Sequence, residues 1–148
     1  MLSSDRDEDI LVVSDPASSV ILKIEIKKMP LKLSAQVLQS YSTDAKVPVS
    51  LVRHILDFLM FADVSATGGI IRMNLETGME SLALPRTEFC QPHGLAVLND
   101  EEIIFSDVTS HQVKKLAEGQ TSFFIGSGER GRKCGPAKTA HLTHSRQA

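Results

Sequence analysis

The chain contains 148 residues, of which 42% are hydrophobic and 23% are charged, with a formal net charge of −2. This length suits one domain with a buried core, and the balanced charge excludes a molecule-wide field for nucleic acid or membranes. No apolar run approaches the roughly 18–20 residues needed to cross a bilayer, so we expect no membrane partner.

The N-terminal segment and the cysteines indicate the compartment. Residues 1–9 form an acidic segment that lacks the basic start and apolar core of a signal peptide. Cys90 and Cys134 stand outside any CxxC or ligand-spaced cluster, so neither a zinc site nor a disulfide framework is expected. We therefore expect a cytoplasmic protein with free thiols.

One pattern occurs three times along the chain. Residues 11–15 (LVVSD), 59–63 (LMFAD) and 103–107 (IIFSD) each contain three apolar residues, a small residue and an aspartate. The aspartates are 48 and 44 residues apart, which matches the roughly 40–50-residue period of propeller blades. After each aspartate comes a segment with an apolar residue, a basic residue two positions later and another apolar residue.

Each repeat predicts short antiparallel strands. The apolar triplet is typical of a strand buried on both faces, and the aspartate ends it by accepting hydrogen bonds from the following amides. Turn residues at 76–78 and 118–119 lead into further strands. We therefore predict an all-β chain with about three four-stranded antiparallel blades of an incomplete β-propeller. The predicted blades are residues 10–58, 59–102 and 103–142, followed by a tail at 143–148.

A proline marks the strand that precedes the triplet. Pro48 and Pro92 each lie 15 residues ahead of the next repeated aspartate. The competing interpretation is an amphipathic helix over residues 49–61, where apolar residues have helical spacing. Periodicity alone does not decide between them, and the register of the repeat favours strands.

The third repeat, QPHGLAVLNDEEIIFSDVTSHQVKKL (residues 91–116), resembles an NHL repeat. It has the Pro-x-Gly start, the acidic turn, the triplet with aspartate and the apolar-basic-apolar strand. The middle repeat, LMFADVSATGGIIRMNLETG, is similar also to YWTD-type and lactonase-type propellers. The resemblance implies the six-bladed NHL β-propeller family, with about three blades present. The repeat at Pro48 departs from it by lacking the glycine, and residues 29–47 are irregular.

Closure of the ring is the difficulty for this interpretation, because propellers have about four to eight blades. The chain is expected to be a fragment of a larger propeller, a divergent fragment, or a chain completed by self-association. Open blade edges are prone to pair with other chains. We therefore expect oligomerisation or poor solubility when this chain is expressed alone.

His93 is the candidate for catalysis, because a propeller strand start lies near the central channel and a histidine there could act as a ligand or base. A lone histidine lacks the convergent polar partners of a catalytic site, so a structural role is favoured. The repeated aspartates are assigned to turns. His141 and His144, three residues apart, give only a weak indication of metal, and no metal or cofactor is expected.

Basic residues cluster toward the C-terminus. Residues 108–148 carry seven Lys or Arg against two Glu, which leaves a local charge of +5. The candidate contacts for RNA or an acidic partner are Lys114, Lys115, Arg130, Arg132 and Lys133. A solvated loop surface is the competing interpretation, since one Tyr and no Trp are present for base stacking.

Three functions follow from these observations. A scaffold whose propeller loops bind a protein partner needs no motif that the sequence lacks, and it is the leading hypothesis. An RNA-binding surface on the basic C-terminal third is the first alternative. A propeller enzyme of the lactonase or lyase type, with His93 at its site, is the second.

Overall fold

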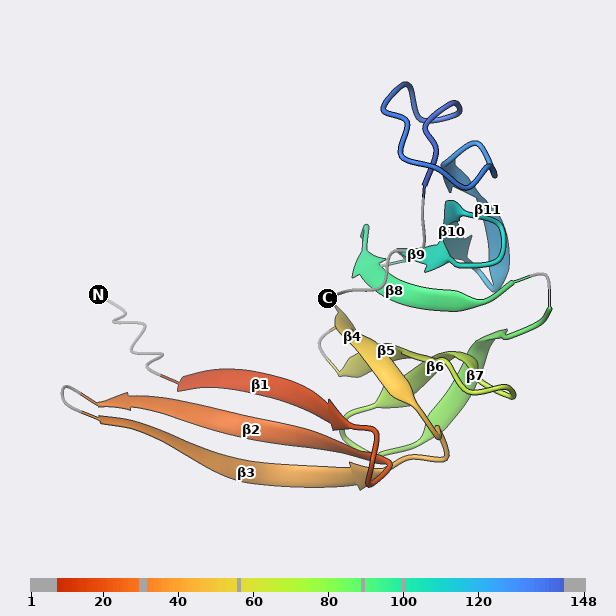
Figure 1. The fold of residues 1–148 in the computed structure, drawn as a ribbon. Helices are drawn as coiled ribbons and strands as arrows, with labels where there is room; N and C mark the ends of the chain where they lie inside the picture. The colour runs from red at the N-terminus through yellow and green to blue at the C-terminus, as the bar shows by residue number, and fades with distance from the viewer. Residues whose placement is uncertain (1–7, 30–31, 56, 89, 100, 143–148) are drawn as a thin grey trace.

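Eleven β-strands form the part of the chain that the structure describes (Figure 1). The computed structural model describes residues 8–29, 32–55, 57–88, 90–99 and 101–142. These residues contain no helix, which confirms the all-β prediction. The predicted acidic segment lies outside the described residues apart from positions 8 and 9, and so does the tail at 143–148.

The strands are grouped into three antiparallel sheets that follow one another along the chain. The first sheet contains β1 (Glu8–Asp15), β2 (Val20–Met29) and β3 (Lys32–Ser42), in that order. The second sheet contains β4 (Pro48–Ile55), β5 (Phe58–Asp63), β6 (Gly69–Asn74) and β7 (Glu80–Pro85). The third sheet contains β8 (Pro92–Val97), β9 (Glu102–Asp107), β10 (Gln112–Ala117) and β11 (Gln120–Ile125).

The sheets begin one strand earlier than the predicted blade boundaries. Each predicted blade begins at or next to an apolar triplet, which gives residues 10–58, 59–102 and 103–142. The second and third sheets instead start at the preceding strand, at Pro48 and Pro92. Each proline strand pairs with the triplet that follows it, because a short turn joins the two strands into a hairpin. The first sheet has three strands in the described residues, not four, and β1 is its edge.

Residues 49–55 and 58–61 are extended rather than helical. They form most of β4 and most of β5, which pair with each other in antiparallel fashion. The pairing contains register shifts, and Ser50 has a positive φ of 51°. The bulge moves the apolar residues away from strict alternation, which explains why their spacing resembles that of a helix.

The second sheet is covered on both faces. Leu59 and Phe61 of β5 lie in a cluster shared with Ile21 and Tyr41 of the first sheet. Met60 and Ala62 lie in a second cluster, shared with Phe105 and other residues of the third sheet. The β5 triplet is therefore a strand with apolar neighbours on both sides, as its composition predicts.

The first sheet extends well beyond the sheets that pack beside it (Figure 1). Its strands span 8, 10 and 11 residues, compared with 6 for most strands of the other sheets. Its end nearest Tyr41 packs against the second sheet, and the opposite end projects free of it. The outer strand β3 is consequently exposed along most of its length.

Two remaining expectations concern membranes and thiols. None of the residues that the structure describes forms a helix able to cross a membrane. Cys90 and Cys134 are both free thiols in the structure. Burial and the neighbouring Asp107 carboxylate raise the pKa of the Cys90 thiol, so this cysteine is largely uncharged at neutral pH.

Candidate binding site

The repeated aspartates hold turns, as the sequence predicts. The Asp15 carboxylate accepts hydrogen bonds from the Ala17 amide at 3.1 Å and the Ser18 hydroxyl at 2.7 Å. Asp63 accepts them from the amide and hydroxyl of Ser65, at 3.0 and 2.9 Å. In each case the carboxylate satisfies donors in the turn that follows its strand.

Asp63 and Asp107 also bind the segment that leads into the inner strand of their sheet. Asp63 accepts hydrogen bonds from the amides of Lys46 and Val47, just ahead of Pro48. Asp107 accepts one from the amide of Gln91, just ahead of Pro92. These two buried side chains therefore join three backbone segments each, and their role is architectural.

Hydrogen bonding outweighs burial in setting the pKa of these two aspartates. Burial alone would raise the pKa of Asp107, but hydrogen bonds from Lys114, Gln91 and Ser110 hold it below its usual value. Burial likewise opposes the effect at Asp63, where bonds from Ser65, Val47 and Lys46 lower the pKa. Both groups are therefore ionised at neutral pH.

His93 lies on β8 and is half-buried. Its Nδ1 atom is shielded from solvent and has no hydrogen-bond partner among the residues that the structure describes. The position that corresponds to His93 in the second sheet is Val49, which packs in the apolar cluster between the second and third sheets. The catalytic role of His93 stays a hypothesis.

The five basic candidates fall into two groups. Lys114 and Lys115 lie on β10 and form ion pairs with Asp107 (2.6 Å) and Glu102 on β9, so their charges are compensated within the sheet. Arg130, Arg132 and Lys133 are exposed in the connection that follows β11. The five basic residues that the sequence groups as candidate contacts are therefore divided between a sheet and a loop.

That connection has its own internal structure. The amides of Gly126 and Ser127 donate to the carbonyls of Ala137 and Ala140, both at 2.8 Å. His141 lies 3.3 Å from Glu129, measured from Nε2 to the carboxylate, while His144 lies outside the described residues. Within the described ranges, no group of three or more His, Cys, Asp or Glu side chains is placed to hold a metal ion.

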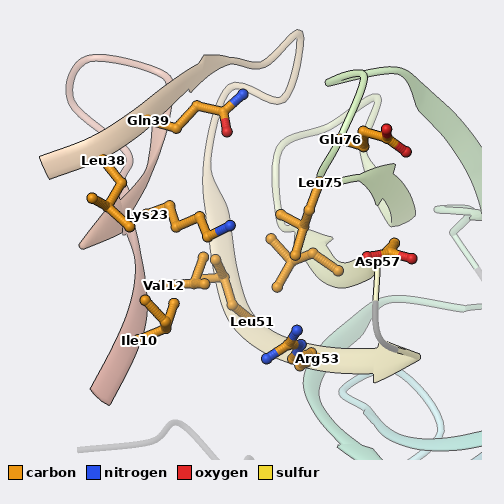
Figure 2. A pocket seen from close by; sticks show the side chains of 11 residues that line it. Ile10, Val12, Lys23, Leu38, Gln39, Leu51, Arg53, Asp57, Leu75 and Glu76 are labelled. Carbon is orange, nitrogen blue, oxygen red and sulfur yellow. The ribbon is translucent and has the colours of Figure 1, made fainter. Parts of the chain in front are cut away.

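A groove opens where the first and second sheets diverge (Figure 2). Its volume is about 750 Å³, within the range of typical ligand sites. Six of its eleven lining side chains are apolar, and charged side chains stand among them. The lining residues are Ile10, Val12, Lys23, Leu38, Gln39, Leu51, Arg53, Asp57, Leu59, Leu75 and Glu76.

Charged side chains stand on both walls of the groove. Lys23 extends from β2 into the groove, and Arg53 lies at the end of β4 (Figure 2). The carboxylates of Asp57 and Glu76 stand on the opposite side, on the turns after β4 and β6. The groove therefore has Lys23 on the wall formed by the first sheet, and Arg53, Asp57 and Glu76 on the wall formed by the second sheet and its turns.

A departure from the repeat explains the position of Lys23. The corresponding basic residues are Arg72, whose guanidinium lies 3.7 Å from the centre of the Phe58 ring, and Lys115, which pairs with Glu102. The residue of the first sheet that corresponds to Phe58 and Glu102 is Ile10. An aliphatic side chain offers neither an aromatic face nor a carboxylate, so the Lys23 side chain points into the groove instead.

Sequence reasoning did not identify the groove. Its lining comes from three strands of the first sheet, two of the second and two turns, which no local motif connects. The one available signal was Ile10 in place of a ring or a carboxylate five residues before the repeated aspartate.

These features define the class of protein as a partial β-propeller. Nineteen chains of solved structures match it, among them a β-propeller chain in the crystal structure of a nidogen/laminin complex. That chain is 18% identical over 78% of this chain, with a TM-score of 0.56. The aligned region is 43% of that chain's own length, so this chain spans less than half of the propeller it matches.

The family comparison then identifies the repeat itself. Residues 89–116 match the NHL repeat, which confirms the resemblance seen in residues 91–116. No curated protein sequence matches the chain significantly. The chain therefore contains an NHL repeat and has the fold of part of a β-propeller.

Proposed function

We propose that this propeller segment is a scaffold that binds a protein partner through the groove between its first and second sheets. The observation that carries the proposal is the groove itself, which is lined by apolar side chains from both sheets and by charged side chains of both signs. Apolar pockets with a few placed polar groups are the usual form of a binding site. The rim includes the turns at Asp57 and Glu76, so blade loops take part in the proposed contact.

An extended protein segment is the occupant that suits this groove best. One apolar side chain fits against Leu51 and Leu75, while a flanking carboxylate meets Lys23 and a flanking ammonium meets Asp57 or Glu76. Burial of such an anchor provides most of the affinity, and the charge pairs fix the direction of the segment. The similar propeller chain comes from a nidogen/laminin complex, which supports a protein as the class of partner.

Peptide selection tests this proposal directly. A random peptide library selected on the chain should yield peptides with an apolar residue between acidic and basic residues. Leu38→Asp and Ile10→Asp should each weaken their binding at least tenfold, because both side chains line the groove yet are exposed enough to tolerate a charge. Met79→Asp, at an exposed position outside the groove, serves as the matched control.

Reversing the charge of Lys23 provides a second test, because it should reverse which peptide charge the groove prefers. Lys23→Glu should reduce binding of the selected peptides and favour variants whose acidic residue is replaced by lysine. Calorimetric titration of both peptides against both chains measures the exchange. Peptides that bind equally well to Leu38→Asp, Ile10→Asp and the unaltered chain would show that the groove is not the site.

RNA binding is a second candidate because Arg130, Arg132 and Lys133 are exposed on one connection. Phosphate contacts by these residues predict retention on RNA that falls steeply as salt is raised. Replacing all three with alanine should abolish that retention, while Lys46→Ala, at an exposed position outside this connection, should have little effect. Salt-independent behaviour of the chain on RNA would count against this candidate.

The enzyme alternative rests on His93 alone. It predicts hydrolysis of simple esters or lactones that is lost in His93→Ala. Equal activity in the altered and unaltered chains would remove His93 from consideration as a catalytic residue.

A further inference from the structure

Equivalent positions in the three sheets differ sharply in exposure. Leu11, Leu59 and Ile103 each lie four residues before the repeated aspartate. Leu59 and Ile103 are 1% and 2% exposed, whereas Leu11 is 46% exposed. Since the three side chains occupy the same position in the repeat, the difference lies in what covers them.

The covering element is the preceding sheet. Leu59 and Phe61 pack against the first sheet, which precedes theirs along the chain. Ile103 and Phe105 pack in the same way against the second sheet. In the first sheet this face has no preceding sheet in the part of the chain that the structure describes. Its cross-strand neighbours extend the apolar surface, which is formed by Leu11, Val13, Leu22, Ile24 and Val37. We call these five residues the leading face.

The third sheet also has an uncovered face, and it is the face that in the second sheet packs against the sheet that follows. Met60, Ala62 and Ile70 of the second sheet are buried against the sheet that follows. Their equivalents in the third sheet are Ile104, Ser106 and Val113, and these residues line an open hollow of about 220 Å³. We call these three residues the trailing face.

The leading and trailing faces are the two halves of one contact. Each contact between successive sheets joins a trailing-type face to a leading-type face, and the residues that the structure describes leave one of each uncovered. A face of one kind that fits a different face on the same molecule makes a head-to-tail interface, which forms a ring when the rotation closes. A second copy of this chain therefore supplies both missing halves at once.

We infer that two copies of this chain pack head to tail, the trailing face of each on the leading face of the other, into a closed ring of six sheets. Six sheets lie within the range of roughly four to eight blades that propellers use. The aligned region is 43% of the length of the similar propeller chain, so two copies provide nearly the content of one such ring. The groove between the first and second sheets is not part of either interface.

Light scattering of the full chain after size separation tests the inference. The unaltered chain should have twice the monomer mass at micromolar concentration, and Leu11→Glu and Val113→Glu should each reduce it to the monomer mass. Met79→Glu places the same charge at an exposed position outside both faces and should remain a dimer. A monomeric unaltered chain, or a mass that keeps growing with concentration, would overturn the closed ring.

Cross-linking then distinguishes head-to-tail packing from pairing of two β1 edges. In a Cys134→Ser background, a short bismaleimide should link the double variant Leu11→Cys/Ile104→Cys into covalent dimers. Neither single variant should be linked, because the ring brings position 11 of one copy to position 104 of the other. Efficient linking of Leu11→Cys alone would show that two β1 edges meet, and the inference would be wrong. This readout does not depend on a variant that disrupts the interface.

Discussion

At the scale of single residues, Asp63 and Asp107 connect segments that are distant in sequence. Asp107 joins Gln91, Thr109, Ser110 and Lys114 through one carboxylate. The turn-forming part of this role follows from an aspartate at a strand end. The hydrogen bond from the Gln91 amide, 16 residues earlier, does not follow from the sequence. The sequence alone does not show that this segment lies beside Asp107. Asp15 shows the turn bonds alone among its described partners.

These aspartates predict that stability falls in acid. Both have a folded-state pKa below the ordinary value of 3.8, so their contribution is complete above that pH and is lost as pH falls through the lower folded-state values. Urea unfolding at pH values from 7 to 2 measures this decline. Asp107→Asn should cost about 3 kcal/mol at neutral pH, because it breaks a buried ion pair with Lys114, and should make the acid decline shallower.

The matched control for this experiment is Asp15→Asn. Asp15 lies at the same position of the repeat, but it is only half-buried and its described bonds are confined to its own turn. The substitution should change the neutral free energy of unfolding far less than Asp107→Asn does, because exposed hydrogen bonds contribute little. An Asp107→Asn variant as stable as Asp15→Asn would contradict the architectural role assigned to the buried carboxylate.

At the scale of elements, the inner strands of neighbouring sheets are joined by one side chain. The Ser50 hydroxyl of β4 accepts a hydrogen bond of 2.7 Å from the amide of Leu95 on β8. Ser50 adopts its positive φ at the bulge of β4. The bulge therefore turns the hydroxyl toward the next sheet, where it accepts the bond from the Leu95 amide.

Ser50→Ala should therefore destabilise the chain by about 1–2 kcal/mol, because it removes the side-chain acceptor of a partly buried amide. Ser81→Ala is the control, since the Ser81 hydroxyl makes a 3.5 Å contact in an exposed position and its loss should cost less than about 0.5 kcal/mol. Denaturant midpoints of the three proteins provide the comparison. Equal midpoints would show that the bond between β4 and β8 contributes nothing.

At the scale of the whole molecule, the strand content and the order of the sheets could be predicted, because both depend on patterns within one repeat. The triplets, the prolines and the aspartates each specify local structure, and the NHL match at residues 89–116 covers one repeat of this kind. The groove could not be predicted, because it forms where the long first sheet diverges from the second. Lys23 and Glu76 line the same groove through the arrangement of sheets, which depends on packing rather than on a motif.

The same arrangement predicts how stability is distributed, since local opening depends on how much apolar contact covers each element. The amides of β5 lie in a strand whose residues 59–63 are all buried, with a sheet on either side. They should exchange with solvent only on global unfolding. The amides of β3 belong to an edge strand that is exposed along most of its length, and they should exchange fastest among the strands. Hydrogen exchange followed by mass spectrometry measures both. The packing of a second copy covers the leading face and leaves the outer edge of β3 open, so this order holds for the dimer as well. If the amides of β3 and β5 were equally protected from exchange, β3 would have to be covered by a contact other than the packing of sheets described above.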